Sequence, residues 1–227
     1  MNTKIKLCSF GLLIAAITLF VGCKEKKVEK PAPKTVEAQV KAVPKTLKQV
    51  GDFASLSFAS IDEASNQLGF LLVDSQGVVQ NSEMNTALRQ YRNLTSSKVV
   101  DSWPVFELKN SNEAIITVQG EGYIGRIWAT ILVGRASGKI KKITLGHLAE
   151  SETHGAKMTR SSFQDQFIGK LVNSQDQTFG HRQDGMIITD GPQLVDGISG
   201  ATVTSRAVVN MLNSGIERYH EYLANAE

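Results

Sequence analysis

Residues 105–145 read VFELKNSNEAIITVQGEGYIGRIWATILVGRASGKIKKITL, and this stretch decides the expected fold. It contains four short runs rich in β-branched residues, which predict strands at Val105–Leu108, Ala114–Gln119, Arg126–Val133 and Lys139–Leu145. Turn-forming residues such as Ser137-Gly138 separate the runs. Because parallel strands need much longer connections, these four strands are expected to pair antiparallel.

The flanking regions add helices to this sheet. Upstream, the pattern predicts a strand at Leu68–Asp74 and a polar helix at 84–91. Downstream, apolar residues at every fourth position predict a helix at Ser161–Val172, followed by a strand at Met186–Thr189. A closing helix from about Ser205 has an apolar stripe formed by Val208, Leu212, Ile216, Tyr219 and Leu223. The expected fold class is therefore α+β, with a twisted antiparallel sheet backed by helices, in a single domain at residues 51–227.

Residues 1–23 are expected to direct export. Lys4 and Lys6 precede an apolar run at 7–22, which ends at Cys23 and is typical of a signal peptide. The run is slightly shorter than the roughly 17–25 residues of a membrane-spanning helix, so a cleaved signal and an uncleaved anchor helix both remain open.

Residues 19–23, Leu-Phe-Val-Gly-Cys, resemble a bacterial lipobox, although Phe20 departs from its usual pattern. The resemblance implies lipidation of Cys23. Either anchor predicts that residues 24–227 lie outside the cytoplasmic membrane, on the periplasmic or exterior side. Since Cys8 is the only other cysteine, the domain contains no thiol and forms no disulfide.

Residues 24–50 are expected to be a flexible Lys/Pro-rich linker, because they contain no aromatic residue and few large apolar ones. Residues 1–50 carry ten lysines and three acidic residues, whereas residues 51–227 carry fifteen basic and nineteen acidic residues. The positive charge thus belongs to the tether and not to the domain. This distribution excludes a typical nucleic-acid-binding surface and suits a tether close to anionic lipids.

Residues 196–205, Asp-Gly-Ile-Ser-Gly-Ala-Thr-Val-Thr-Ser, combine two glycines with several hydroxyls just before the closing helix. The glycines allow a bulky group to approach the backbone, and hydroxyls with free N–H groups at a helix start favour a phosphate. On these residues alone, an ordinary glycine-containing loop with Thr204 or Ser205 as the N-cap is the leading interpretation.

The same segment resembles the flavinylation motif of FMN-binding domains, found in the NqrC-type subunits of sodium-pumping NADH:quinone reductase and in the corresponding flavoprotein subunits of Rnf-type complexes. The resemblance implies that Thr202 carries FMN through a phosphodiester, installed by a flavin transferase that uses FAD and releases AMP. It also implies that the cofactor and its phosphate contact Ser199, Gly200, Ala201, Thr204 and Ser205. Asp196 and Gly197 would belong to the element that the transferase recognises.

The resemblance extends over about residues 103–227. Gly120–Gly125 and Ile127-Trp128 are similar to a glycine-rich strand entry of the family. Residues 152–155 read Glu-Thr-His-Gly where the family usually has Glu-Thr-Pro-Gly, so that His154 replaces a proline. Of this loop, only Thr153 is carried over as a contact of the flavin ring.

The resemblance implies an electron-transfer flavoprotein subunit of a Rnf-like or NADH:quinone-reductase-like membrane complex, without independent catalytic activity. Two alternatives remain open. One is a stand-alone FMN lipoprotein that passes electrons to acceptors outside the cytoplasmic membrane. The other is a non-redox exported lipoprotein that holds an anion reversibly.

No catalytic and no metal-binding residues are predicted. The four histidines, His147, His154, His181 and His220, match no standard metal-ligand spacing. Ser161 and Ser162 lack the Gly-x-Ser-x-Gly context of a hydrolase nucleophile. Trp103 and Trp128 are interpreted as core or rim aromatics, with Trp128 or Tyr123 as a second choice for a residue beside the flavin ring.

Overall fold

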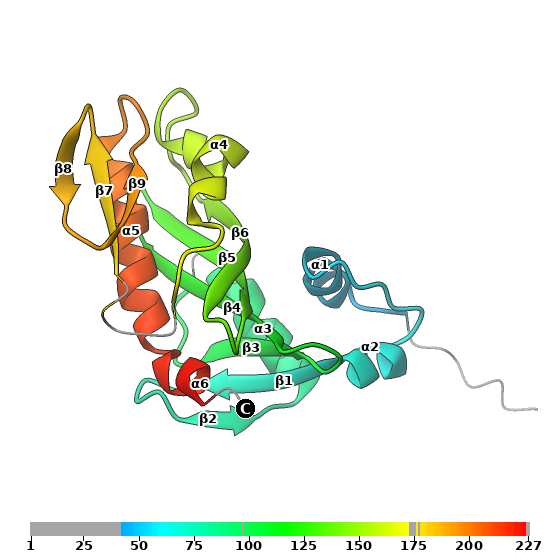
Figure 1. Cartoon of the computed structure of the whole chain (residues 1–227). Coiled ribbons are helices and arrows are strands. Elements are labelled where there is room, and N and C mark those ends of the chain that lie inside the picture. The colour runs from blue at the N-terminus through cyan, green and yellow to red at the C-terminus, as the bar shows by residue number, and fades with distance from the viewer. Residues whose placement is uncertain (1–41, 97, 173–175, 177, 226–227) are drawn as a thin grey trace, which may run out of the picture. The chain divides into compact units, whose positions relative to one another are not determined.

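A computed structural model describes residues 42–227 except 97, 173–175, 177 and 226–227 (Figure 1). The expected signal or anchor segment, with Cys23, lies outside the described residues, as does the expected linker up to residue 41.

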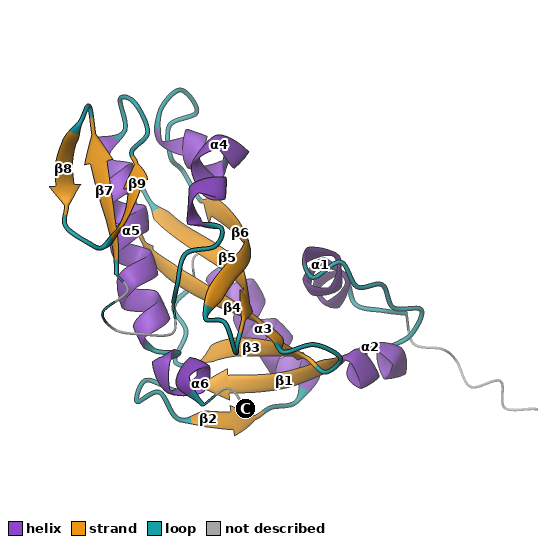
Figure 2. Ribbon diagram, viewed as in Figure 1, coloured by secondary structure: helices purple, strands orange, loops and turns teal. Residues whose placement is uncertain are grey.

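A six-stranded antiparallel sheet forms the centre of the described residues (Figure 2). Its order is β2-β1-β3-β4-β5-β6, with bounds Val79–Asn81, Leu68–Val73, Trp103–Leu108, Glu113–Glu121, Arg126–Gly134 and Lys139–His147. The five strands of this sheet predicted from sequence are all present, and strands β3 to β6 follow one another as a meander. The α+β fold class is confirmed.

Both faces of this sheet are buried, because successive side chains along a strand point to opposite sides. Phe106 in β3 belongs to one core and its neighbour Val105 to the other. Strand β4 divides in the same way between Ile115 and Ile116. Two separate cores therefore lie on the two faces of one sheet.

Helices α1 (Lys45–Phe53), α2 (Ile61–Gln67) and α3 (Met84–Leu94) supply residues to the first core. Helix α1 begins at Lys45, within the segment that was expected to be linker, so the linker prediction is wrong for Lys45–Val50. Leu47 and Val50 are buried, and their packing against the sheet outweighs the polar composition of the segment.

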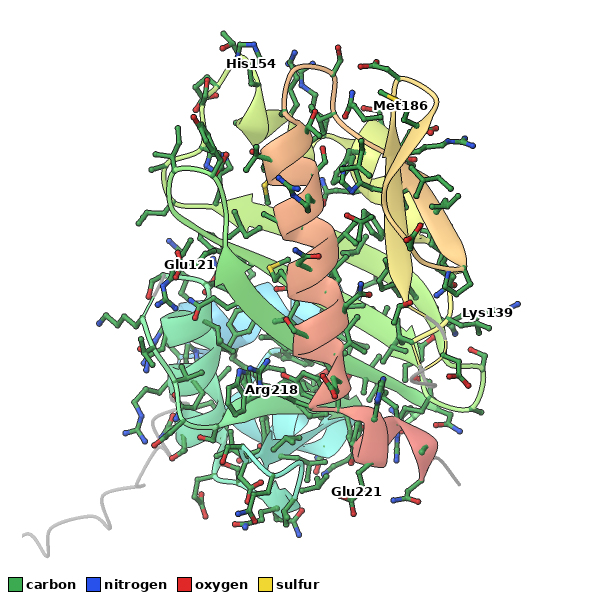
Figure 3. The ribbon with its side chains drawn as sticks, turned by 90° about the vertical axis from the view of Figure 1, so that its left-hand side faces the viewer. Glu121, Lys139, His154, Met186, Arg218 and Glu221 are labelled. Carbon is green, nitrogen blue, oxygen red and sulfur yellow. The ribbon has the colours of Figure 1, made fainter. Side chains whose placement is uncertain are left out.

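Helix α5 (Thr202–Glu217) packs on the second face, along strand β4. Glycines allow this close approach: a Cβ atom on Gly215 would lie 2.6 Å from Cβ of Val118. Beyond the helix end, the buried Tyr219 hydroxyl donates to the Thr117 carbonyl at 2.8 Å. Figure 3 shows α5 lying lengthwise over the sheet, with His154 near its first turn and Arg218 at its other end.

A second, three-stranded sheet also packs against α5, with order β8-β7-β9 and bounds Met186–Thr189, Phe179–Gln183 and Gln193–Asp196. Only β8 was predicted from sequence. Strands β7 and β9 pair parallel, contrary to the expectation of a purely antiparallel fold.

The helix predicted at Ser161–Val172 is much shorter in the structure. A 3₁₀ helix η1 (Gly155–Thr159) precedes it, α4 spans Ser161–Gln164, and a 3₁₀ turn η2 covers Asp165–Phe167. The backbone then leaves the helix at Gly169, which has φ +81°, and the Gly169 N–H donates to the Ile140 carbonyl at 2.8 Å. Pairing with the edge of β6 thus replaces further helical turns.

The closing helix starts three residues earlier than predicted, at Thr202 instead of Ser205, and ends at Glu217. A short helix α6 (His220–Ala224) follows. Tyr219 and Leu223 of the predicted apolar stripe therefore lie beyond the break, where both are buried.

Candidate functional site

The segment 196–205 forms the connection between β9 and α5. Gly200 has φ +74°, a left-handed conformation that glycine adopts without strain. The Ala201 N–H donates to the Ile198 carbonyl at 2.8 Å and closes the turn. The Ser205 hydroxyl accepts from the Ile198 N–H at 2.8 Å and donates to the Ala201 carbonyl at 3.0 Å. The loop is therefore fixed to the first turn of the helix that follows.

Three hydroxyls lie on the first turn of α5, and they differ in availability. Thr204 and Ser205 are 2% and 0% exposed and point into the protein, so the prediction that they face outward is wrong. The Thr204 hydroxyl donates to Oε2 of Glu150 at 2.8 Å. Thr202 is half-buried, and its hydroxyl makes no hydrogen bond with any described residue. Thr202 thus offers the one unbonded hydroxyl among the three.

The N-cap of α5 is Ala201, and not Thr204 or Ser205 as predicted. Ala201 has no hydroxyl, and no side chain caps the helix start. The first-turn N–H groups therefore lack intrahelical partners and form the positive end of the helix dipole. This end of a 16-residue helix attracts an anion.

A cavity of about 460 Å³ opens at this helix end. Its lining comes from four segments and comprises Tyr123, Glu150, Ser151, His154, Gly155, Gly200, Ala201, Thr202, Val203 and Thr204. Among the predicted cofactor contacts, the structure brings Gly200, Ala201 and Thr204 to the cavity with Thr202. Ser199, Ser205 and Thr153 do not line it.

Glu150 connects the walls of this cavity, although nothing in its sequence context indicates such a role. Its carboxylate is buried, and Oε1 accepts from the Ile124 N–H at 2.9 Å while Oε2 accepts from Thr204. A Cβ atom on Gly155 would lie 2.2 Å from Oε2, and one on Gly122 would lie 2.4 Å from Oε1. Two glycines therefore make room for a carboxylate that joins the β4–β5 loop to α5.

The loop at 151–155 places His154 on the cavity wall. Its Nδ1 lies 2.9 Å from the Thr153 hydroxyl, which lies 3.2 Å from the Ser151 hydroxyl. The ring edge faces Gly200, where a Cβ atom would lie 2.8 Å from Cδ2 of His154. Thr153 itself is exposed and approaches the cavity only through the histidine.

Asp196 and Gly197, the expected recognition element, line a different and smaller cavity of about 230 Å³ together with Ser199. The Asp196 backbone exchanges two hydrogen bonds with the Gln166 side chain, at 2.6 and 3.1 Å. Its exposed carboxylate pairs with Arg182, and this hydrogen bond holds the pKa of Asp196 below its usual range. The element thus has a rigid backbone and an accessible charge.

Aromatic and apolar side chains border the site unevenly. Tyr123 lines the cavity and is 68% exposed, and Val203 is 44% exposed. Trp128 does not line it; its ring packs on Gly146, where a Cβ atom would lie 2.4 Å from the indole. Of the two aromatics considered for the flavin ring, the structure places Tyr123 at the site.

Two searches restricted to the described residues gave negative findings. No cluster of three or more His, Cys, Asp or Glu side chains is arranged to hold a metal ion. None of the described helices has the length and apolar character needed to cross a membrane.

Comparison with known proteins gives the same family as the motif. Residues 122–217 match the model of the FMN-binding domain family. The C-type subunit of the Na(+)-translocating NADH-quinone reductase from Yersinia pestis is 25% identical over 170 residues, covering 73% of this chain and 60% of the relative. Its counterpart from Vibrio alginolyticus is 30% identical over 112 residues, covering 46% and 42%. The chain thus spans about two fifths to three fifths of the length of these curated relatives.

Solved structures share the fold. The C-type subunit of the Na(+)-translocating NADH-quinone reductase from Parabacteroides distasonis aligns with a TM-score of 0.59 at 22% identity, covering 81% of this chain and 92% of that structure. NqrC of Shewanella oneidensis aligns with a TM-score of 0.60 at 16% identity, covering 80% and 99%.

Proposed function

We propose that this chain, a member of the FMN-binding domain family through residues 122–217, carries FMN covalently on Thr202 and transfers electrons as a subunit of a membrane redox complex. The observation that carries the proposal is the state of the Thr202 hydroxyl. It lies at the first residue of α5, it lines the cavity, and it has no partner among the described residues, whereas the hydroxyls of Thr204 and Ser205 are both engaged.

The residues present fit a phosphodiester and a flavin ring. The uncapped N–H groups at the start of α5 suit the single negative charge of the phosphodiester. The cavity volume of about 460 Å³ lies within the range of roughly 300–1,000 Å³ that is typical of cofactor pockets. Tyr123 and Val203 offer exposed apolar surface for a ring. When bound, FMN supplies the electron-accepting and electron-donating chemistry, and the protein sets its position.

The attachment reaction is a phosphoryl transfer to Thr202. The hydroxyl oxygen forms a bond to the FMN-side phosphorus of FAD, the bond between that phosphorus and the AMP oxygen breaks, and AMP leaves. The hydroxyl proton passes to a base, because an uncharged threonine hydroxyl is a weak nucleophile. Glu150, the acid that lines the cavity, already accepts from Thr204 and Ile124. We therefore assign the base to the transferase and a tethering role to Thr202.

The assembly is proposed from the relatives, which are named as subunits of a Na(+)-translocating NADH-quinone reductase. We propose that this chain is likewise a subunit of a complex of that type or of the Rnf type, and that it has no catalytic activity of its own. A signal peptide or anchor at residues 1–23, with lipidation of Cys23, would hold the domain on the outer face of the membrane. Palmitate labelling tests the lipid: labelling that persists in Cys23→Ala would contradict this site.

Intact-mass spectrometry after co-expression with a flavin transferase tests the covalent cofactor. The wild type is expected to gain the mass of one FMN phosphoryl group, and Thr202→Ala is expected to lose it. Ser199→Ala is the matched control, since it removes an exposed hydroxyl from the same loop and should remain fully flavinylated. A wild type without the added mass would contradict covalent attachment and favour a reversible anion site, and added mass on Thr202→Ala would move the attachment elsewhere.

A further inference from the structure

The cavity beside Thr202 has an unusual charge balance. Among the described residues that line it, Glu150 carries a negative charge, and lysine and arginine are absent. His154 is the only lining side chain that can become positive. Glu150 receives hydrogen bonds from Ile124 and Thr204 but forms no ion pair within the described part of the chain.

A phosphodiester on Thr202 would bring a second negative charge into the same cavity. The helix end offers partial positive charge of about half an elementary charge. That is less than the charge of one anion, and Glu150 already lies at the same helix end. A cationic hydrogen-bond donor on the wall would offset the remainder, and the lining offers only the imidazole of His154 for this role.

The His154 ring is oriented before any ligand arrives. The Thr153 hydroxyl occupies Nδ1, and the ring edge that carries Cδ2 and Nε2 faces Gly200, two residues from Thr202. The backbone is held on both sides, since the His154 N–H donates to the Ser151 carbonyl at 3.1 Å and the His154 carbonyl accepts from the Lys157 N–H at 3.1 Å. Nε2 has no hydrogen-bond partner within the described residues. When Thr153 donates to Nδ1, the neutral ring carries its proton on Nε2 and is a donor toward the cavity.

We propose that His154 is a positioning residue for the covalent cofactor: its Nε2 donates a hydrogen bond to the phosphodiester on Thr202, and the attached anion favours protonation of the ring. This inference rests on the proposed flavinylation of Thr202. It gives this chain a pH-sensitive contact at the tether, because histidine is the side chain whose ordinary pKa lies between about pH 5 and 8.

Other ionisable groups surround the ring, and their contribution must be separated from its own. They are Glu150 and Tyr123 on the cavity wall, Glu152 in the same loop, Lys157 in η1, Asp196 before the glycine turn and Arg206 in α5. Carboxyl groups ordinarily titrate near pH 4, and tyrosine, lysine and arginine near pH 10 or above. A transition near neutral pH at this cavity therefore reports the histidine.

Phosphorus-31 NMR of the flavinylated protein tests the contact directly. A phosphodiester does not itself titrate near neutral pH, so an inflection in its chemical shift between about pH 5 and 8 comes from a neighbouring group. The wild type is expected to show one inflection. His154→Phe, which keeps a ring against Gly200, and His154→Gln are both expected to lose it. His220→Gln removes a histidine that does not line the cavity and should leave the inflection unchanged.

Nitrogen-15 NMR of His154 gives a second readout that does not depend on a substitution of the histidine. Protonation of the ring is expected to be about three- to tenfold more favourable in the flavinylated wild type than in unloaded Thr202→Ala, which corresponds to a pKa about 0.5–1 higher.

The outcomes separate this inference from the proposed function. A flavinylated wild type whose phosphorus signal does not titrate, or titrates unchanged in both His154 variants, overturns the role of His154 and leaves the attachment intact. The same holds if the His154 pKa is equal in loaded and unloaded protein. A wild type that never acquires the FMN mass overturns the proposed attachment and the role of His154 with it.

Discussion

Replacing Thr204 with valine should separate the structural hydroxyl of the α5 first turn from the one that carries FMN. Valine has nearly the same shape, but it cannot donate to Glu150, whose carboxylate is 4% exposed and receives the Thr204 hydroxyl at 2.8 Å. A hydrogen bond to a charged group contributes roughly 1.5–3 kcal/mol, so Thr204→Val should lower the free energy of unfolding by about 2 kcal/mol. For a domain of this size, that corresponds to a fall of about 4–8 °C in Tm.

Differential scanning calorimetry and intact-mass spectrometry on the same samples would measure both properties. Thr204→Val should unfold earlier but still acquire FMN at temperatures well below its Tm. Thr202→Val should show the opposite behaviour, with a free energy of unfolding within about 0.5 kcal/mol of the wild type and no FMN. Thr204→Ser keeps the hydroxyl and serves as the control for the hydrogen bond.

Two results would refute this assignment. Thr204→Val with the Tm of the wild type would mean that the contact with Glu150 contributes no stability. A flavinylated Thr202→Val beside an unflavinylated, folded Thr204→Val would exchange the roles of the two hydroxyls.

Three further predictions use other parts of the site. Gly155→Ala should lower the free energy of unfolding by about 2 kcal/mol or more, because its Cβ would lie 2.2 Å from Glu150, whereas Gly125→Ala, with 3.6 Å to its nearest neighbour, should be tolerated; equal melting temperatures would contradict this. Burial holds the pKa of His181 below its ordinary value, so the unfolded chain is protonated first as the pH falls, and stability should drop below about pH 6.5. Urea unfolding at neutral and acidic pH should show a weaker dependence in His181→Gln; an unchanged dependence would rule out His181 as its source. Asp196→Asn should alter stability by less than about 1 kcal/mol, since its ion pair is exposed, yet reduce flavinylation as measured by mass; full loading would exclude the carboxylate from recognition.

The strands were predictable because their signal is local. Runs of β-branched residues between turn residues marked β3 to β6 closely, as the observed bounds of Glu113–Glu121 and Arg126–Gly134 illustrate. The helix predicted at Ser161–Val172 failed for a non-local reason. Phe163 and Phe167 are both buried as their spacing indicates, but the chain after them pairs with β6, and no local pattern reveals such a partner.

The candidate site divides in the same way. The motif around Thr202 could be found from sequence because its residues are contiguous and resemble a known family. Glu150 could not, since its significance depends on Ile124 and Thr204, which lie 26 and 54 residues away. The burial of Thr204 was missed because a three-residue shift in the helix start turns its side chain from the surface to the interior.

The long sequence separations at the site also bear on the order in which the protein folds. Strands β3 to β6 pair with their sequence neighbours, so the loops that close between them are short and cost little chain entropy. The contacts that seat α5 are far apart by comparison, with 54 residues between Glu150 and Thr204 and 102 between Thr117 and Tyr219. We therefore expect the meander to form early and the cavity to close late. Substitutions in the seat of α5 should then accelerate unfolding far more than they slow refolding.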